Sequence, residues 1–235
     1  MAEVVRQMRP SGRTVGSMRI VIAGGHGQIA LRLERLLAAR GDEVAGIIRS
    51  AEQSEDLRKA GAEPVVLDLE SASVDEVARL LRGADAAVFA AGAGPGSGVA
   101  RKETVDKGAA VLFADAAVRA GVRRHLVVSS MRADAAHKGD EVFDVYLRAK
   151  GEADDHVRRQ EALDWTILRP GSLTNDAGTG QVRLEAHTGR GMIPRDDVAA
   201  VLAELVETPA TAGLTLELVS GSAPVSVAVK SVAGN

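Results

Sequence analysis

The stretch Gly24-Gly25-His26-Gly27-Gln28-Ile29-Ala30 decides the fold that this sequence predicts. It follows a short apolar segment, residues 18–23, that indicates a buried strand, and it leads into a helical pattern over residues 28–40. Glycines let a backbone approach a ligand closely, and a helix N-terminus presents N–H groups that have no partner within the helix. The stretch therefore predicts a loop that binds the pyrophosphate of a dinucleotide. A glycine-rich turn without a ligand is the alternative.

The rest of the chain alternates strand-like and helix-like segments, which is typical of a parallel sheet covered by helices. We expect strands at residues 18–23, 43–48, 64–67, 86–90, 125–129, 165–168 and 214–219. We expect helices at residues 28–40, 54–60, 74–82, 104–120, 143–159 and 196–206, with Asp196 capping the last of them. The predicted fold class is α/β: a single doubly wound Rossmann-type parallel sheet with helices on both faces.

The length of 235 residues fits one compact domain, and no linker marks a second one. Residues 1–17 contain arginines but no continuous apolar stretch, so we expect a flexible extension rather than a signal peptide. Residues 18–235 are predicted to form one NAD(P)-binding Rossmann domain. A small C-terminal segment, about residues 171–220, is expected to shape the substrate pocket.

Composition excludes several classes of function. The net charge is −3 and no long basic block occurs, which argues against nucleic acid as a partner. No run of about 18 apolar residues could span a membrane, and the chain has no cysteine, so we expect a cytoplasmic protein. The histidines lack the spacing of metal ligands, and we predict no metal site. A small-molecule substrate is the expected partner, and the protein could be a monomer or a homodimer.

The residues that follow the second, third and fourth strands predict how a dinucleotide is held. Arg49 and Ser50 end the second strand where an NAD-binding protein usually has a carboxylate, which favours NADP(H) because an arginine accommodates the 2′-phosphate. Surface arginines are common, so this preference stays open. Asp68-Leu69 follows the third strand, and the small residues Ala90-Ala91-Gly92 follow the fourth, where they leave room for the cofactor.

Tyr146 is the only tyrosine in the chain, and Lys150 stands four residues after it. Residues four apart share one face of a helix, so the ammonium group can lie near the phenol oxygen or the cofactor and favour the phenolate. The pair therefore predicts an acid/base unit. An ordinary amphipathic helix with a surface lysine is the alternative.

In that order these residues resemble the atypical branch of the short-chain dehydrogenase/reductase superfamily, over about residues 18–220. The branch includes NmrA-like proteins, proteins similar to biliverdin and flavin reductases, and proteins named only as sugar epimerases. The resemblance also covers Val127-Val128-Ser129-Ser130, Arg169-Pro170-Gly171 and the late segment 193–199. It departs from the pattern at Ala30, which stands at the third glycine position.

The resemblance implies roles for individual residues. Ser129 or Ser130 would lie near the nicotinamide and polarise a substrate oxygen, and Pro170 would line the nicotinamide pocket. Lys150 would hold the nicotinamide ribose and make Tyr146 more acidic. The cofactor-binding set is then completed by the loop and strand-end residues Gly24, Gly27, Gln28, Ile29, Arg49, Ser50, Asp68, Leu69, Ala90, Ala91 and Gly92.

Three functions remain in competition. The first is an NADP(H)-dependent oxidoreductase that transfers a hydride to or from a small carbonyl, quinone or flavin-like substrate, with Tyr146 moving the proton. The second is a non-enzymatic NAD(P)H sensor or regulator, as in NmrA-like proteins. The third is an NAD-dependent sugar-nucleotide epimerase or dehydratase, which usually devotes more chain after the Rossmann core to its substrate than the roughly 65 residues that follow Gly171.

Overall fold

A computed structural model describes residues 16–94 and 96–234, so most of the predicted N-terminal extension, residues 1–15, lies outside the described residues. The strands that carry the site are β1 (Arg19–Ala23), β2 (Glu43–Ile48), β3 (Glu63–Val66), β4 (Ala86–Phe89), β5 (Arg124–Val128), β6 (Asp164–Pro170) and β10 (Leu214–Ser220). Two further strands, β8 (Gln181–Glu185) and β11 (Ala223–Pro224), extend one edge of the same sheet.

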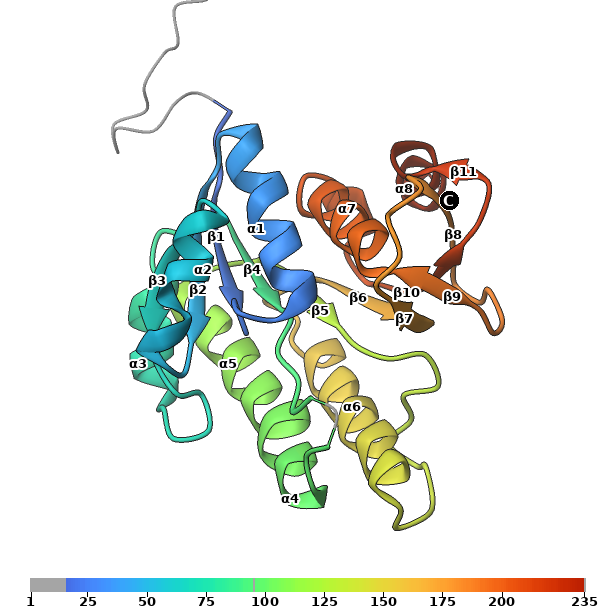
Figure 1. Cartoon of the computed structure of the whole chain (residues 1–235). Coiled ribbons are helices and arrows are strands. Elements are labelled where there is room, and N and C mark those ends of the chain that lie inside the picture. The colour runs from blue at the N-terminus through green and yellow to red at the C-terminus, as the bar shows by residue number, and fades with distance from the viewer. Residues whose placement is uncertain (1–15, 95, 235) are drawn as a thin grey trace, which may run out of the picture.

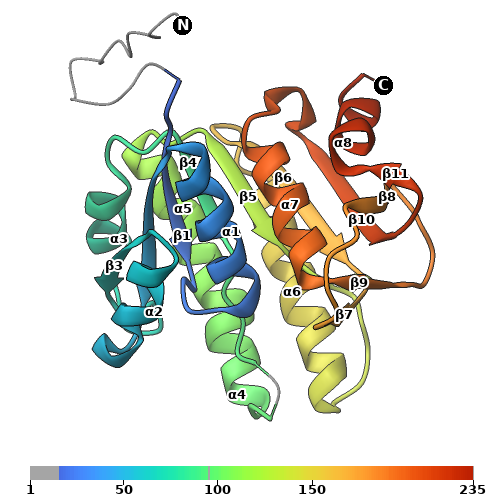
Figure 2. The same cartoon turned by 45° about the horizontal axis from the view of Figure 1, so that its top comes forward.

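The described strands of this sheet follow the order β11-β8-β10-β6-β5-β4-β1-β2-β3 (Figures 1 and 2). Strands β10 through β3 in that order are parallel, whereas β8 and β11 are antiparallel to their neighbours. The chain runs outward from β1 to β3 and then returns to β4 on the other side of β1. This confirms the predicted doubly wound sheet, and it creates a crevice at the carboxyl ends of β1 and β4, where such sheets bind ligands.

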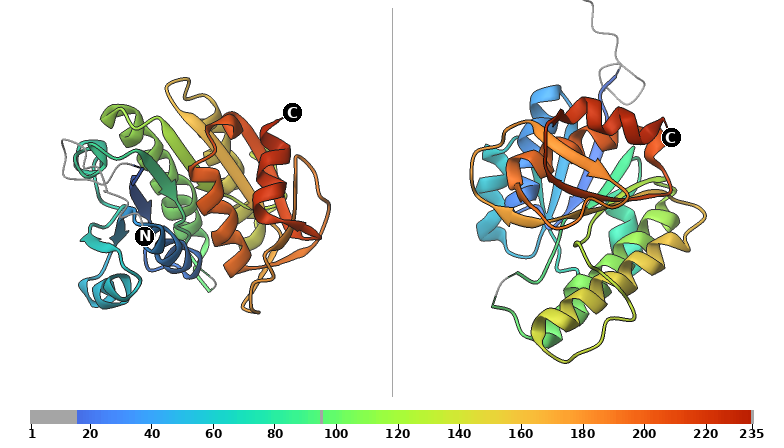
Figure 3. Two further views of the ribbon diagram at one scale, coloured as in Figure 1. Left: turned by 90° about the horizontal axis from the view of Figure 1, so that it is seen from above. Right: turned by 90° about the vertical axis from the view of Figure 1, so that its right-hand side faces the viewer.

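Helices cover both faces of the sheet because alternate side chains of each parallel strand enter two separate apolar cores. In β1, Ile20 and Ile22 pack on one face, and Val21 and Ala23 pack on the other. The first face is covered by α1 (Gln28–Arg40), α2 (Ser54–Lys59), α7 (Arg195–Val206) and α8 (Val225–Ala233), and the second by α3 (Val74–Leu81), α5 (Ala110–Ala120) and α6 (Val142–Arg158), as the right-hand view of Figure 3 illustrates. None of the described helices is long and apolar enough to cross a membrane.

The predicted helix over residues 104–120 starts earlier and is not uniform. A short α4 (Val99–Arg101) leads into a π-helical segment, η2 (Lys102–Ala109), which continues into α5. Each π-helical turn contains more residues than an α-helical turn, and an apolar pattern with the α-helical period does not reveal it. The side chains of η2 therefore have directions that the sequence pattern did not predict, and η2 packs beside α6 (Figure 1).

The C-terminal part contains more regular structure than predicted. The segment between β6 and α7 holds β7 (Ser172–Thr174), β8 and β9 (Met192–Pro194), and β7 pairs with β9 in a separate small sheet. The prediction that the strand over residues 214–219 is the last one was wrong, because β11 and α8 follow it.

Asp196 does not cap α7, contrary to the prediction. Pro194 occupies the N-cap position, and Asp196 lies in the first helical turn. Its carboxylate instead accepts hydrogen bonds from Arg32 Nε at 2.5 Å and from the backbone N–H of Gly178 at 3.2 Å. A carboxylate in the first turn still interacts favourably with the helix dipole. Asp196 therefore connects α7 both to α1 and to the loop before β8.

Candidate active site

Two adjoining cavities follow the carboxyl edge of the sheet at the crevice between β1 and β4. The smaller has a volume of about 240 Å³ and lies over the ends of β2 and β3. The larger has a volume of about 970 Å³ and extends over the ends of β5 and β6. Gly27 and the segment Ala90-Ala91-Gly92 line both cavities, so the two form one groove with a shared floor.

The glycine-rich loop forms one wall of this groove. Gly24 has a φ of 78°, and a Cβ atom there would lie 2.6 Å from the Cα of Ala91, so only glycine fits this close approach. Gly27 is the N-cap of α1, it supplies no capping side chain, and the first turn of α1 contains no acidic residue. The first N–H groups of α1 therefore remain available to an anion.

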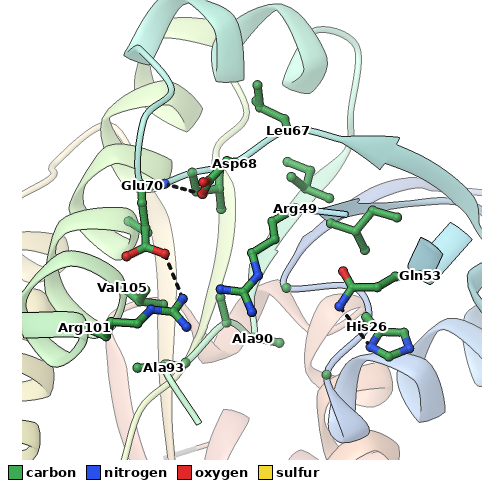
Figure 4. Close-up of a pocket in the computed structure, with 18 residues that line it drawn as sticks. His26, Arg49, Gln53, Leu67, Asp68, Glu70, Ala90, Ala93, Arg101 and Val105 are labelled. Carbon is green, nitrogen blue, oxygen red and sulfur yellow. Dashed lines mark hydrogen bonds and ion pairs between the residues drawn. The ribbon is translucent and has the colours of Figure 1, made fainter. Parts of the chain in front are cut away.

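Two arginines, Arg49 and Arg101, line the smaller cavity. Figure 4 shows the guanidinium groups of Arg49 and Arg101 entering from opposite sides and facing each other. Arg101 forms an ion pair with Glu70 at 2.8 Å, and Thr104 donates a hydrogen bond to the same carboxylate at 2.6 Å. The hydroxyl of Thr104, together with Arg101, lowers the pKa of Glu70. Arg49 has no hydrogen bond or ion pair with any described residue, and its charge also contributes to lowering the pKa of Glu70.

The larger cavity contains the predicted Tyr146–Lys150 pair together with two residues of η2. Lys150 is 4% exposed, and its ammonium nitrogen lies 3.4 Å from Oδ1 of Asp106 and 3.2 Å from the carbonyl oxygen of Val128. The ring of Tyr146 stacks on Phe143 with centroids 5.9 Å apart. The ammonium of Lys102 lies 5.2 Å from the centroid of the Tyr146 ring, within the range of a cation–π interaction.

Asp106 connects the two lysines. Its Oδ2 lies 3.9 Å from the Lys102 nitrogen and accepts a hydrogen bond from the backbone N–H of Ala93 at 3.3 Å. Lys102 also donates to the carbonyl oxygen of Gly94 at 3.0 Å. Because Asp106 is 1% exposed, this carboxylate is a buried counter-charge for both ammonium groups.

The two predicted serines differ in what their hydroxyls contact. Ser129 is buried and donates to Asp154 Oδ2 at 2.8 Å, and Arg169 donates to the same oxygen at 2.7 Å. Burial raises the pKa of Asp154, while the Arg169 guanidinium and the Ser129 hydroxyl act in the opposite direction. Ser130 is half-buried and contacts only the carbonyl oxygen of Met131, at 3.2 Å. Ser130 therefore has the hydroxyl that is free to reorient toward a ligand.

The groove brings together nearly all the residues that the sequence predicted for the site. Ser50 is the exception, because it is absent from the described lining of both cavities. Sequence reasoning missed Gln53, Glu70, Arg101 and Lys102. Arg101 and Lys102 follow the glycine-rich loop after β4 at the start of a helix, as Gln28 follows the first such loop, and this position was the available signal. Among the described residues there is no cluster of His, Asp and Glu that could hold a metal ion.

Comparisons with known proteins agree with this geometry. Residues 24–209 match the model of a family described as NAD(P)H-binding. An uncharacterised sugar epimerase of Bacillus subtilis, YhfK, is 35% identical over 91% of this chain and 99% of its own length. The structure of a candidate NAD-dependent epimerase/dehydratase from Bacillus halodurans has a TM-score of 0.83 and 35% identity, covering 93% of this chain and all of the other. The oxidoreductase YlbE of Lactococcus lactis has a TM-score of 0.80 and 26% identity, covering 93% and 98%.

Proposed function

The chain belongs to the NAD(P)H-binding protein family, and we propose that it is an NADP(H)-dependent oxidoreductase of the short-chain dehydrogenase/reductase type. A small carbonyl, quinone or flavin-like molecule is the proposed substrate. One observation carries the proposal: Tyr146, Lys150 and the N-terminus of α1 line the same cavity. A proton donor is thus in the same space as the helix end that suits a cofactor pyrophosphate.

The residues of the groove fit a dinucleotide. Gly24 lets the glycine-rich loop pack directly against Ala91, where a Cβ atom would clash, and the uncapped first turn of α1 offers backbone N–H donors. Gly27, Gln28 and Ile29 would hold the pyrophosphate, and Asp68 and Leu69 would border the adenine. Lys150 and Pro170 would contact the nicotinamide half, which reaches the larger cavity across the floor formed by residues 90–92.

The preference for NADP(H) rests on Arg49 and Arg101. A 2′-phosphate is a dianion near neutral pH, and two guanidinium groups that face each other can both donate to it. Glu70 already neutralises part of the charge of Arg101, so Arg49 supplies the larger share of the attraction. Ser50 remains a proposed second donor next to Arg49.

In the proposed reaction the bound cofactor supplies or accepts a hydride. Tyr146 gives a proton to the substrate oxygen when a carbonyl is reduced, and it takes the proton back in the reverse direction. Ser130 donates a hydrogen bond to the same oxygen, and Ser129 orients the strand end through Asp154. Lys102 and Lys150 share the buried counter-charge of Asp106 in the same cavity as Tyr146.

A second candidate is an NAD-dependent epimerase or dehydratase, because the names of two relatives mention such activities. This function would need the same Tyr146 and Lys150, but a cofactor that stays bound and is regenerated in each turnover. An NAD(P)H sensor without turnover is the remaining alternative.

The test combines cofactor binding with turnover. We expect NADPH to bind more tightly than NADH, and NADPH oxidation to be measurable with some members of a panel of aldehydes, quinones and flavins. Tyr146→Phe should lower turnover of aldehydes at least tenfold without weakening NADPH binding. Equal turnover by Tyr146→Phe would remove Tyr146 from the mechanism. Purification with bound NAD would favour the epimerase, and tight binding without any turnover would favour the sensor.

A further inference from the structure

The larger cavity has an unusual balance of charge for a protein with a net charge of −3. Its lining includes one carboxylate, that of Asp106, and Asp106 already faces two lysines. The cationic lining residues come from five different segments of the chain: Lys102, Arg132, Lys150, Arg190 and Arg195. A cavity with one sign of charge and low-dielectric walls concentrates the field and attracts ions of the opposite sign.

Arg132 and Arg190 each stand next to a residue that hydrogen-bonds the segment joining β6 to β7. The residue before Arg132, Met131, donates its N–H to the carbonyl oxygen of Pro170 at 3.3 Å. The residue after Arg190, Gly191, accepts a hydrogen bond from the N–H of Ser172 at 2.9 Å. Backbone contacts therefore fix the positions of both arginines along residues 170–172, beside the expected nicotinamide site.

The backbone of Arg132 gives an independent reason to assign its side chain a role. The N–H of Ala133 bonds the carbonyl oxygen of Ser130 at 3.1 Å, which closes a turn with Arg132 at its third position. Arg132 has a φ of 67° and is the one residue other than glycine with a positive φ in the described chain. This turn position favours glycine, and such local strain is often kept at functional sites.

Neither Arg132 nor Arg190 has a protein partner that would explain its presence. Both side chains are exposed at the cavity, and no described residue forms a hydrogen bond or ion pair with either. The cofactor phosphates have other positions available, at the N-terminus of α1 and between Arg49 and Arg101. The charge of Arg132 and Arg190 therefore faces the part of the cavity left for a second ligand.

We propose that the substrate is an anion whose carboxylate or phosphate group is bound by Arg132 and Arg190. This inference rests on the proposed function, because it describes the second ligand of the same site. Arg195, which donates to Asn175 at 2.9 Å, and Lys102 line the same cavity and add to the attraction.

The test uses three aldehydes that share one reactive group. 4-Carboxybenzaldehyde carries a carboxylate, 4-formylphenyl phosphate carries a phosphate, and methyl 4-formylbenzoate is neutral. We expect kcat/KM with NADPH to be at least tenfold higher for one or both anions than for the ester. Arg132→Gly and Arg190→Gln should each lower kcat/KM for the preferred anion about tenfold by raising its KM. The kcat/KM for the ester should stay the same in both variants. Arg79→Gln is the matched control, since Arg79 is exposed on the last turn of α3.

Two further measurements separate this inference from the proposed function. Binding of the three aldehydes to the protein saturated with NADP⁺ is measured by calorimetry, which does not depend on turnover. Preferential binding of the anions that is lost in Arg132→Gly supports the anion site even if no aldehyde is reduced. Equal binding of the ester, or a loss of NADPH affinity in Arg132→Gly as large as the loss for the anions, would overturn it. Arg132→Gly should unfold at the same temperature as the parent or higher, so a folding defect cannot explain the expected loss.

Discussion

The ammonium nitrogen of Lys150 lies 3.4 Å from the carboxylate of Asp106, which belongs to the π-helical segment η2. The same carboxylate faces Lys102 at 3.9 Å. One buried negative charge is thus shared between two positive charges beside Tyr146. The net charge beside Tyr146 therefore depends on all three groups rather than on Lys150 alone.

Asp106→Asn should lower the stability of the protein. The substitution keeps the shape of the side chain but leaves the buried ammonium groups of Lys102 and Lys150 without their counter-charge, so we expect the free energy of unfolding to fall by about 3 kcal/mol. Urea unfolding measures the difference. Glu103→Gln is the control, because Glu103 lies on the same π-helical segment but pairs with Lys107. Equal stability of the parent and Asp106→Asn would contradict the shared charge.

Ser129→Ala should lower the stability of the protein, whereas Ser130→Ala should lower its activity. Ser129→Ala removes a buried hydrogen bond to Asp154, and we expect unfolding free energy to fall by about 1–2 kcal/mol while the KM for a carbonyl substrate stays unchanged. Ser130→Ala removes only a contact to Met131, so stability should remain within about 0.5 kcal/mol while kcat falls. Denaturant unfolding and steady-state kinetics on both variants check the pair, and a reversed pattern would move the polarising role to Ser129.

Glu34→Gln should remove a pH dependence of stability. The carboxyl of Glu34 is fully buried beneath the glycine-rich loop, neither oxygen has a described partner, and burial raises its pKa from 4.5 to about 8. The folded state therefore holds the proton more tightly than the unfolded state between these values, and stability falls as pH rises through that window. The free energy of unfolding of Glu34→Gln, relative to that of the parent, should increase by at most about 1.4 kcal/mol per pH unit from pH 4.5 to 8.

The measurement for Glu34 is urea unfolding at pH 5 and pH 8 for the parent, Glu34→Gln and the exposed control Glu52→Gln. Glu52→Gln should follow the parent at both pH values, because the Glu52 side chain is exposed to solvent. A constant difference between the parent and Glu34→Gln across the two pH values would show that the Glu34 carboxyl is not desolvated in solution.

Arg49→Ala should weaken NADPH binding much more than NADH binding. A charge-assisted hydrogen bond contributes about 1.5–3 kcal/mol, so the dissociation constant for NADPH should rise roughly 10- to 100-fold. Fluorescence titration with both nucleotides measures the ratio, and Arg79→Ala controls for the loss of a surface charge. A parent that prefers NADH, or an equal loss for both nucleotides, would contradict the proposed role of Arg49.

The parts of the fold that the sequence predicted well are those in which one local rule dominates. The helix α1 was predicted to the residue because a glycine-rich loop precedes it, an apolar stripe runs along it and Gly41 ends it in a left-handed conformation. Strand β8 was missed although buried and exposed residues alternate along Gln181–Glu185. A single five-residue alternation without a flanking helix gives too weak a signal for a sheet-edge strand.

In the candidate site, too, features set by local sequence could be predicted and features set by tertiary packing could not. Glycines and strand ends are fixed by backbone geometry, so local sequence could predict that the glycine-rich loop and residues 90–92 lie together at one edge of the sheet. Lys102 and Asp106 reach the groove from a π-helical segment, and no residue pattern predicted that segment. The contact between Ser129 and Asp154 likewise depends on how α6 packs against the sheet, which is a tertiary property.

The arginines of the larger cavity and the glycine-rich loop are held in place by different means. Arg132 and Arg190 stand in connecting loops, whereas the glycine-rich loop lies between the buried strand β1 and the packed helix α1. Loops accept substitutions and insertions at little cost to folding. The charge of the larger cavity can therefore be redesigned at these two positions without disturbing the packing that holds the other half of the groove.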